Sequence, residues 1–527
     1  MKIVVIGSGF GGLAAANRLQ AQGHQVVMLD KRDKPGGRAY VYEQDGFQFD
    51  AGPTIITAPY IIDGIFEAAG KRRQDYVELV KLDPFYNIRF EDGSVFRYVD
   101  REEELIAQIR EFNPQDVEGY YKLKNKAQAT YEKAMPLIDK SFHKLGDMLK
   151  AAPDMLKVEA YRSVAGVVND YIQDYRLRQV FSFHPLFLGG HPFKSSAMYT
   201  MIHRLEQEMG VWFVMGGTGA LVRAFVKLFQ EQGGELRQNE TVEQILIDDK
   251  TRKARGVRLV SGEEILADAV VCNGDVGNLY LKMVPKQYRR WNSDFRIKTL
   301  KFSMSAFVLY LGTNRRYDNL AHHEILMGPR YKPLLDDIFR RKLLADDFSL
   351  YVHRPTATDP SLAPPGGDAF YILSPVPNLQ KGDIDWSVKA PEYRNVIVKY
   401  LEDRGYMPDL SKHIVSEHHI DPDHFSGELN SFRGSAFGVE PTLTQSAWFR
   451  PHNQSEDISN LYLVGAGTHP GAGVPGVLSS GKIVADMIGT AAQTARVAHQ
   501  QPSLAGRRDK PRRSGFPIRP LEWGSRL

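Results

Sequence analysis

Two glycine-rich stretches near opposite ends of the 527-residue chain have the residue types and spacing that bind a pyrophosphate. Gly7, Gly9 and Gly12 stand in VIGSGFGG, and a second G-x-G-x-x-G match spans residues 471–476 in THPGAGVPG. Glycines at this spacing let the backbone turn sharply and approach a phosphate, which the amide groups of a helix N-terminus then bind. Either the chain binds two dinucleotides, or its two ends close on one.

The elements expected around the first match complete a dinucleotide site. KIVVIG is a buried-strand pattern, LAAANRLQAQG predicts a helix, and HQVVMLD predicts a second strand that ends at Asp30. In this context Gly7 permits the tight turn, Gly9 lets the backbone approach the pyrophosphate, and Gly12 lets helix and strand pack closely. The carboxylate of Asp30, with Lys31 beside it, is placed to bind the ribose hydroxyls.

The second match lacks this context. LYLVG predicts a buried strand, but the match begins several residues after it, and no strand with a terminal acid follows the helix expected from about Val474 to Ile488. We expect this strand to join the first sheet and its helix to point its N-terminus at the other end of the same cofactor. Gly465, Gly467, Gly473 and Val474 are the cofactor-binding residues expected there.

The stretch DKPGGRAYVYEQDGFQFDAGPT indicates which dinucleotide is bound. Its GGR resembles the extension of the nucleotide fingerprint in a flavoprotein superfamily that includes amine oxidases and carotenoid desaturases. The resemblance implies that the cofactor is FAD and that Gly37 and Arg38 lie against it. It also implies that Gly52, Pro53 and Thr54 pass close to the flavin ring. The alternative for the glycine pair is an ordinary turn.

From about residue 1 to 490 the chain resembles the bacterial-type phytoene desaturases, and most closely their lycopene-forming members. The resemblance rests on FSFHPLFLGG, GVWFVMGGTGALV, LAHHEILMGPRY, GSAFGVEPTLTQSAWFRPHN and the last glycine-rich loop. It implies FAD-dependent conversion of 15-cis-phytoene, through partly desaturated carotenes, to lycopene, with hydride transfer to flavin N5. It also places the backbone near Val242 beside the adenine.

Other functions remain open at this point. A carotenoid isomerase or ketolase could use the same scaffold, and a non-enzymatic prenyl-lipid carrier could keep the fold without the flavin; the intact glycine loops argue against the carrier. The chain offers no second nucleotide site, so oxygen or a membrane quinone is the expected electron acceptor. A polyene has no polar handle, so some side chains of FSFHPLFLGGHPF are expected to line an apolar tunnel.

The sequence indicates a catalytic acid or base only weakly. Asp147 and Lys150 lie three residues apart in GDMLKAAP, where the resemblance implies an acid–base pair, commonly with Arg in the second position. Lys150 departs from that pattern, and a solvent-facing ion pair is the alternative. No metal site is expected, because His322, His323 and His469 have no ligand set around them in the sequence.

The predicted fold is α/β with several domains: a Rossmann-like FAD-binding domain, a mixed-sheet substrate domain and a helical insertion. The FAD-binding domain is expected in three parts, with the other segments between and after them. The FAD-binding parts are residues 1–104, 206–296 and 451–492, the helical insertion is 105–205, the substrate domain is 297–450, and a basic tail is 493–527.

Charge and composition limit the partners. The net charge is +4, but residues 505–527 carry seven basic and two acidic side chains, so the remainder is about −1 and no nucleic acid is expected to bind it. The tail is a candidate for contact with anionic lipid or a solubilising extension.

No apolar run reaches about 18 residues. Cys272 is the only cysteine, which suits a reducing compartment. We therefore expect a cytoplasmic protein at a membrane surface, where the helical pattern of EILMGPRYKPLLDDIFRRKLLADDF could dock.

Overall fold

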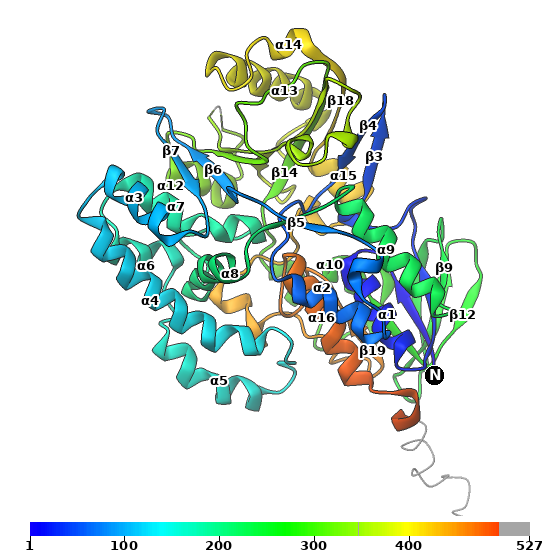
Figure 1. The fold of residues 1–527 in the computed structure, drawn as a ribbon. Helices are drawn as coiled ribbons and strands as arrows, with labels where there is room; N and C mark the ends of the chain where they lie inside the picture. The colour runs from blue at the N-terminus through cyan, green and yellow to red at the C-terminus, as the bar shows by residue number, and fades with distance from the viewer. Residues whose placement is uncertain (346, 495–527) are drawn as a thin grey trace, which may run out of the picture.

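The computed structural model describes residues 1–345 and 347–494, so residues 495–527 of the basic tail expected at 493–527 lie outside the described residues. Two sheets organise the chain: a parallel sheet near the N-terminus and a larger mixed sheet beyond it, with a group of helices alongside both (Figure 1). This arrangement is the multi-domain α/β fold that the sequence predicts.

The first sheet has the strand order β19-β13-β1-β2-β9 and all its pairs are parallel. Its strands are β1 (Lys2–Ile6), β2 (Gln25–Leu29), β9 (Glu235–Arg237), β13 (Ala269–Cys272) and β19 (Leu461–Leu463). Ile3 pairs with Ala269, and Val270 on the other side pairs with Leu461. The strand near the C-terminus therefore joins the sheet that the N-terminal strand begins, as predicted.

Both faces of this sheet are covered, which explains why its strands are apolar throughout. Ile3 and Val5 pack against helices, and the alternate residues Val4 and Ile6 pack against a three-stranded meander. The helices are α1 (Phe10–Ala21), α2 (Pro59–Ala68), α9 (Thr218–Glu231) and α16 (Val474–Ile488). The meander consists of β10 (Val242–Ile247), β11 (Ala254–Leu259) and β12 (Glu264–Leu266).

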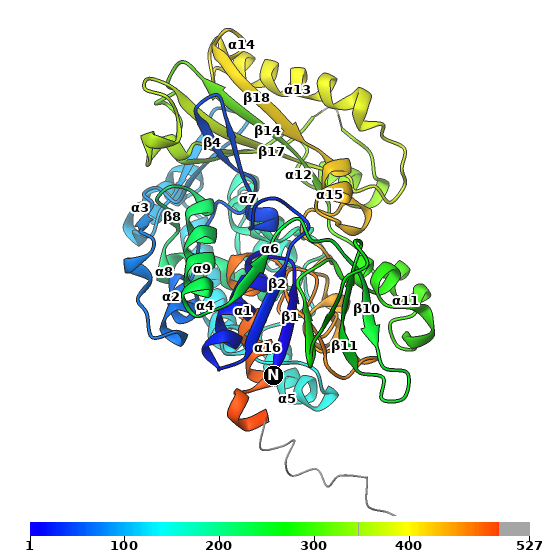
Figure 2. The ribbon, with the colours of Figure 1, turned by 90° about the vertical axis from the view of Figure 1, so that its right-hand side faces the viewer.

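The second sheet is mixed, with the order β18-β14-β17-β16-β15-β6-β7, in which only β15 and β6 pair in parallel. Its strands are β6 (Tyr86–Arg89), β7 (Val95–Tyr98), β14 (Ser305–Thr313), β15 (His323–Leu326), β16 (Leu350–His353), β17 (Asp368–Val376) and β18 (Ile414–Ile420). Helix α13 (Trp386–Asp403) lies across its outer face (Figure 2). The hairpin of β3 (Val41–Gln44) and β4 (Phe47–Asp50) packs on the inner face.

This topology corrects the first predicted domain boundary. Residues 1–104 were expected to lie within the FAD-binding domain, yet β6 and β7 belong to the second sheet. The β6–β7 hairpin lies in the second sheet because Ile88 pairs with Ile325 in β15. Its Phe96 and Tyr98 pack on the helical region. A two-stranded ribbon of β5 (Leu79–Lys81) and β8 (Trp212–Val214) pairs the segment that precedes the helical region with the segment that follows it.

A group of helices extends from residue 102 to residue 209, around the segment 105–205 that was expected to form a helical insertion. Its helices are α3 (Glu102–Phe112), α4 (Asp116–Ala134), α5 (Leu145–Lys157), α6 (Val164–Tyr171), α7 (Tyr175–Ser182) and α8 (Met201–Met209). Short helices elsewhere are α10 (Val276–Asn278), α11 (Asp294–Thr299), α12 (Tyr331–Asp336), α14 (Leu410–His413) and α15 (Pro422–Gly427). Among the described residues, no helix combines the length and the apolar character needed to cross a bilayer.

Candidate active site

One cavity of about 540 Å³ runs from the glycine-rich loops of the first sheet to the inner face of the second. The loops contribute Gly7, Gly9 and Gly473 to its wall, and the second sheet contributes Tyr371 and Leu373. Its volume is in the range of small-molecule and cofactor sites. The cavity therefore has a polar end formed by backbone groups and an apolar end formed by side chains.

The first loop places backbone amides at the polar end. Helix α1 begins at Phe10, three residues after Gly7, and its N-cap Gly9 makes no side-chain hydrogen bond. A Cβ atom on Gly12 would lie 2.0 Å from the carbonyl oxygen of Gly7, so only glycine fits there. Gly7 and Gly9 line the cavity, whereas Gly12 does not. Gly12 thus allows helix α1 to pack closely against the loop that precedes it. The free amide groups of the first turn of α1 can then bind an anion.

Asp30 stands at the end of β2, next to this loop. Its carboxylate accepts hydrogen bonds from the Ser8 amide at 2.7 Å and the Arg32 amide at 2.9 Å. Asp30 is buried at the cavity wall, and the half-buried Lys31 lines the wall beside it. Val242, at the start of β10, lines the same end. The structure therefore brings together the three residues that the sequence assigned to the ribose and adenine.

Arg38 and the loop after β4 follow along the cavity. The guanidinium of Arg38 is buried; its Nη2 donates to Ser431 Oγ at 2.5 Å, and its Nε has no partner among the described residues. Burial lowers its pKa, although the Asp275 carboxylate acts in the opposite direction. An unpartnered buried N–H on a cavity wall suits an acceptor such as a phosphate or flavin oxygen. Gly37, with Gly52, Pro53 and Thr54, lines the adjoining wall.

The second loop closes on the first. A Cβ on Gly11 would lie 2.8 Å from the Gly465 amide nitrogen, so the two loops are in backbone contact. Gly465, Gly473 and Val474 line the cavity, and Gly467 does not. Helix α16 begins at Val474 with no side-chain cap, so its N-terminus also faces the cavity. Both ends of the chain therefore form one site, which answers the question raised by the repeated motif.

The apolar end is formed by two segments. Phe183, Leu186, Phe187 and Leu188 come from the Phe- and Leu-rich stretch that the sequence marked as a tunnel candidate. The other segment, which includes α12, contributes Leu334, Leu335 and Ile338. These three side chains are buried. This segment belongs to EILMGPRYKPLLDDIFRRKLLADDF, whose helical pattern was expected to dock on a membrane. Its apolar side faces the cavity instead, so little of that side is available to a bilayer.

Asp147 and Lys150 lie in α5, and neither lines the cavity. The Asp147 carboxylate accepts the amide of Lys144 at 3.3 Å as part of the helix N-cap, and Lys150 is exposed. No ion pair joins them in the described part of the chain. The residues to which the resemblance assigned an acid–base pair thus lie in the first turns of a surface helix, away from the cavity.

The sequence analysis missed a buried carboxylate at the apolar end. Glu206 in α8 is 1% exposed and lines the cavity. Its Oε2 accepts a hydrogen bond from Tyr86 at 2.5 Å and lies 3.2 Å from His184 Nε2. The signal was its position four residues after the cavity-lining Ile202, which puts a carboxylate on the apolar face of the helix.

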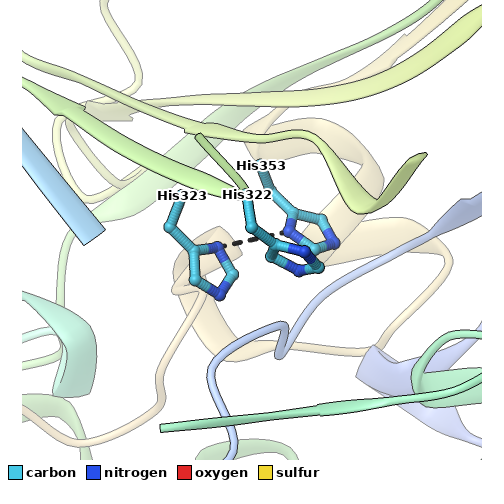
Figure 3. Close-up of side chains that lie close together, drawn as sticks. All are labelled: His322, His323 and His353. Carbon is cyan, nitrogen blue, oxygen red and sulfur yellow. Dashed lines mark hydrogen bonds between the residues drawn. The ribbon is translucent and has the colours of Figure 1, made fainter. Parts of the chain in front are cut away.

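The expectation that His322 and His323 have no further ligand residue around them is wrong. Strand β16 brings His353 beside them, so three buried imidazoles lie together (Figure 3). The Nδ1 atoms have partners: Thr358 for His322 at 2.6 Å, Tyr351 for His323 at 2.8 Å, and His323 for His353 at 3.3 Å. Burial, and next the neighbouring imidazoles, hold all three pKa values well below the usual range. The cluster is therefore neutral and contains no carboxylate or thiol.

Comparison with known proteins defines the class. The model of the family described as flavin containing amine oxidoreductase matches residues 10–489. The chain therefore belongs to this family, and its predicted cofactor, FAD, is confirmed. A solved oxidoreductase from Methanosarcina mazei has the same fold, with a TM-score of 0.60 and 18% identity over 93% of this chain and 100% of its own.

Relatives with much higher identity narrow the comparison. A lycopene-forming phytoene desaturase from Pseudescherichia vulneris is 50% identical over 92% of this chain and 99% of its own length. Another lycopene-forming phytoene desaturase, from Pantoea ananas, is 49% identical over 92% of this chain and 98% of its own. The resemblance noted in the sequence is thereby confirmed over nearly the whole length of both relatives.

Proposed function

We propose that the protein is an FAD-dependent desaturase that converts 15-cis-phytoene to lycopene by successive dehydrogenations. The observation that carries this proposal is the single cavity, whose backbone loops suit a dinucleotide and whose other end is an apolar slot. When bound, FAD supplies a hydride acceptor at N5. The names of the two close relatives support phytoene as the substrate and lycopene as the product.

The residues of this chain have distinct tasks in that reaction. The amide groups at the start of α1 bind the pyrophosphate, Asp30 binds ribose, and Arg38 donates to the cofactor through its unpartnered Nε. The N-terminus of α16 lies at the cavity wall, where its dipole would favour the negative charge that a bound flavin gains on reduction. Phe183 and Phe187 hold the polyene against it and exclude water.

A membrane surface is part of the proposal, because the substrate is lipid-soluble. Helix α5 exposes Leu145, Leu149 and Leu156, which are 53%, 65% and 65% exposed, and no residue of this thirteen-residue helix is buried. Met135 and Ile138, shortly before α5, line the cavity. With Lys150 and Lys157 on the same helix, α5 suits peripheral docking on an anionic bilayer beside the cavity. Together with the single cysteine, this supports a place at the cytoplasmic face of a membrane.

The test incubates the purified flavoprotein with phytoene in liposomes under anaerobic conditions. We expect bleaching of the flavin absorbance by phytoene and, with quinone or oxygen added, accumulation of lycopene without any NADP requirement. Product analysis distinguishes desaturation from isomerisation or ketolation. Turnover that strictly needs NADP would overturn the single-dinucleotide site, and a protein that purifies without flavin would favour the carrier.

The docking element has its own test. Replacing Leu149 and Leu156 together by Ser should weaken binding to anionic liposomes in sedimentation by roughly 30-fold, because about 2 kcal/mol of apolar burial is lost. Flavin reduction by phytoene in detergent micelles should stay unchanged. The matched control is Val388→Ser in α13, which is 55% exposed on the outer face of the second sheet. Unchanged sedimentation of the double variant would exclude α5 as the docking element.

A further inference from the structure

A buried polar network borders the apolar end of the cavity. Glu206, Tyr86 and His184 form a triangle: Tyr86 donates to Glu206 Oε2 at 2.5 Å, and His184 Nε2 lies 3.2 Å from both the carboxylate and the Tyr86 hydroxyl. Tyr98 lies beside Tyr86 with ring centroids 4.7 Å apart, and its hydroxyl contacts His203 Nδ1. A carboxylate, two phenols and two imidazoles are thus enclosed next to a wall that consists mainly of apolar and aromatic side chains.

Such a network is costly to bury and is held in a defined protonation pattern. Burial first, and then the charge of Glu206, raise the pKa of Tyr86 and of Tyr98 well above the usual range, so both phenols keep their protons. Burial lowers the pKa of His203 to about 3, so this imidazole is neutral. The Glu206 carboxylate therefore accepts a hydrogen bond from a Tyr86 phenol that keeps its proton, and carboxylate oxygens have further acceptor capacity.

The network also lies near the cofactor end. Phe187 packs edge-on between Tyr86, at 6.1 Å, and Tyr351, at 6.3 Å, and the Tyr351 hydroxyl lies 2.6 Å from Thr54 Oγ1. Leu188 reaches the second glycine loop, because a Cβ on Gly473 would lie 2.7 Å from its Cδ2. Glu206 is thus connected through three aromatic side chains, Tyr86, Phe187 and Tyr351, to the segment that the sequence places against the flavin ring.

We propose that Glu206 is the catalytic base of the desaturation, an inference that rests on the proposed function. Each step removes two hydrogens from adjacent saturated carbons. One leaves with its electron pair to oxidised FAD, which is reduced by two electrons. The other leaves as a proton to the Glu206 carboxylate, and its C–H electron pair becomes the new π bond. The Glu206 carboxyl group gives up this proton when the reduced flavin is reoxidised, because oxygen or a quinone takes up two electrons and two protons, and the carboxylate is then ready for the next step.

The test measures anaerobic flavin reduction by phytoene in a single turnover. Wild-type reduction is established first, because its absence would overturn the proposed function and this inference with it. With the wild type active, Glu206→Gln should slow reduction by about 10² to 10⁴-fold while flavin content and phytoene binding stay unchanged. Glu206→Asp should recover part of the rate. The matched control is Glu208→Gln on the same helix, an exposed partner of Arg204, which should leave the rate unchanged.

A second variant covers the case in which Glu206→Gln fails to fold. Tyr86→Phe keeps the carboxylate and removes one hydrogen-bond donor to it, so the acid limb of the pH profile of the reduction rate should move to higher pH. The groups that face Glu206 are Tyr86, Tyr98, His184 and His203. Reduction by Glu206→Gln at the wild-type rate, or an unshifted acid limb in Tyr86→Phe, would overturn the assignment.

Discussion

The two glycine-rich loops fit the same sequence pattern and have different architectures. In the first, only residues 7–9 separate β1 from α1, whereas residues 464–473 separate β19 from α16 in the second. The first is a tight turn that aims its helix directly from the strand end. The second is a longer path that reaches the far end of the same cavity. Motif spacing alone does not distinguish them; the distance from strand end to helix start does.

The steric room around the helix glycines follows the same difference. A Cβ on Gly12 would lie 2.0 Å from the Gly7 carbonyl oxygen, while a Cβ on Gly476 would lie 3.0 Å from the Gly471 carbonyl oxygen. The first contact is with the backbone of a three-residue turn that cannot move. The second needs a shift of a few tenths of an ångström in a loop with more freedom. The first loop thus has no room for a side chain at its helix glycine, whereas the second loop can shift to accommodate one.

The largest expected effect comes from exchanging these two glycines for alanine separately. Gly12→Ala should prevent recovery of folded flavoprotein, because helix α1 cannot pack on its own turn without separating from the sheet. Gly476→Ala should fold, bind flavin and lose about 1 kcal/mol or less of stability, the size of a modest overpacking cost. Soluble yield, flavin content and thermal unfolding measure both variants. Equal behaviour of the pair would remove the distinction between the loops.

A smaller and more specific effect is expected at Gly9. This glycine has an ordinary backbone conformation, and its Cβ would meet only the Asn273 side chain closely, at 2.7 Å from Nδ2. Gly9→Val should therefore fold but lose flavin, because its side chain fills the space that the pyrophosphate needs. The flavin absorbance per protein, with circular dichroism as the check of folding, measures it. A folded variant with full flavin content would refute the placement of the pyrophosphate.

Much of the cofactor end could be predicted because it depends on local sequence. The turn at Gly7, the strand that ends before Asp30 and the start of α16 at Val474 each follow from neighbouring residues, and strand pairing then brings the segments together. For the apolar lining, the expectation was that some side chains of residues 181–193 line a tunnel for a polyene, and the structure shows Phe183 and Phe187 among those that do.

The apolar end could be predicted only in part, because its polar residues meet through long-range contacts. Glu206 and Tyr86 are 120 positions apart, and His353 reaches His323 only through the pairing of β15 with β16. The β6–β7 hairpin, placed with the wrong domain, is the element that carries Tyr86 to Glu206. For Asp147 and Lys150 the helix was predicted correctly, but which of its faces meets solvent depends on packing that the sequence does not specify.

The smallest expected effect distinguishes the loops by their response to acid. The second loop contains His469, whose burial, followed by the charge of Arg450, lowers its pKa to about 4; residues 7–12 of the first loop contain no titratable side chain. Between about pH 6.5 and 4 the unfolded chain binds a proton at this position and the folded chain does not, so stability falls as the pH falls, by up to about 1.4 kcal/mol per pH unit. His469→Asn should remove this contribution.

Thermal unfolding at pH 7.5 and 5.5 measures the effect as a difference between variants, since other buried histidines such as His322 and His353 also destabilise the wild type in acid. The drop in Tm between the two pH values should be smaller in His469→Asn than in the wild type by roughly 2 °C, as expected for about 1 kcal/mol in a protein of this size. The exposed His419, replaced by Asn, is the control and should leave the drop unchanged. An equal drop in His469→Asn and the wild type would mean that the second loop is no more sensitive to acid than the first.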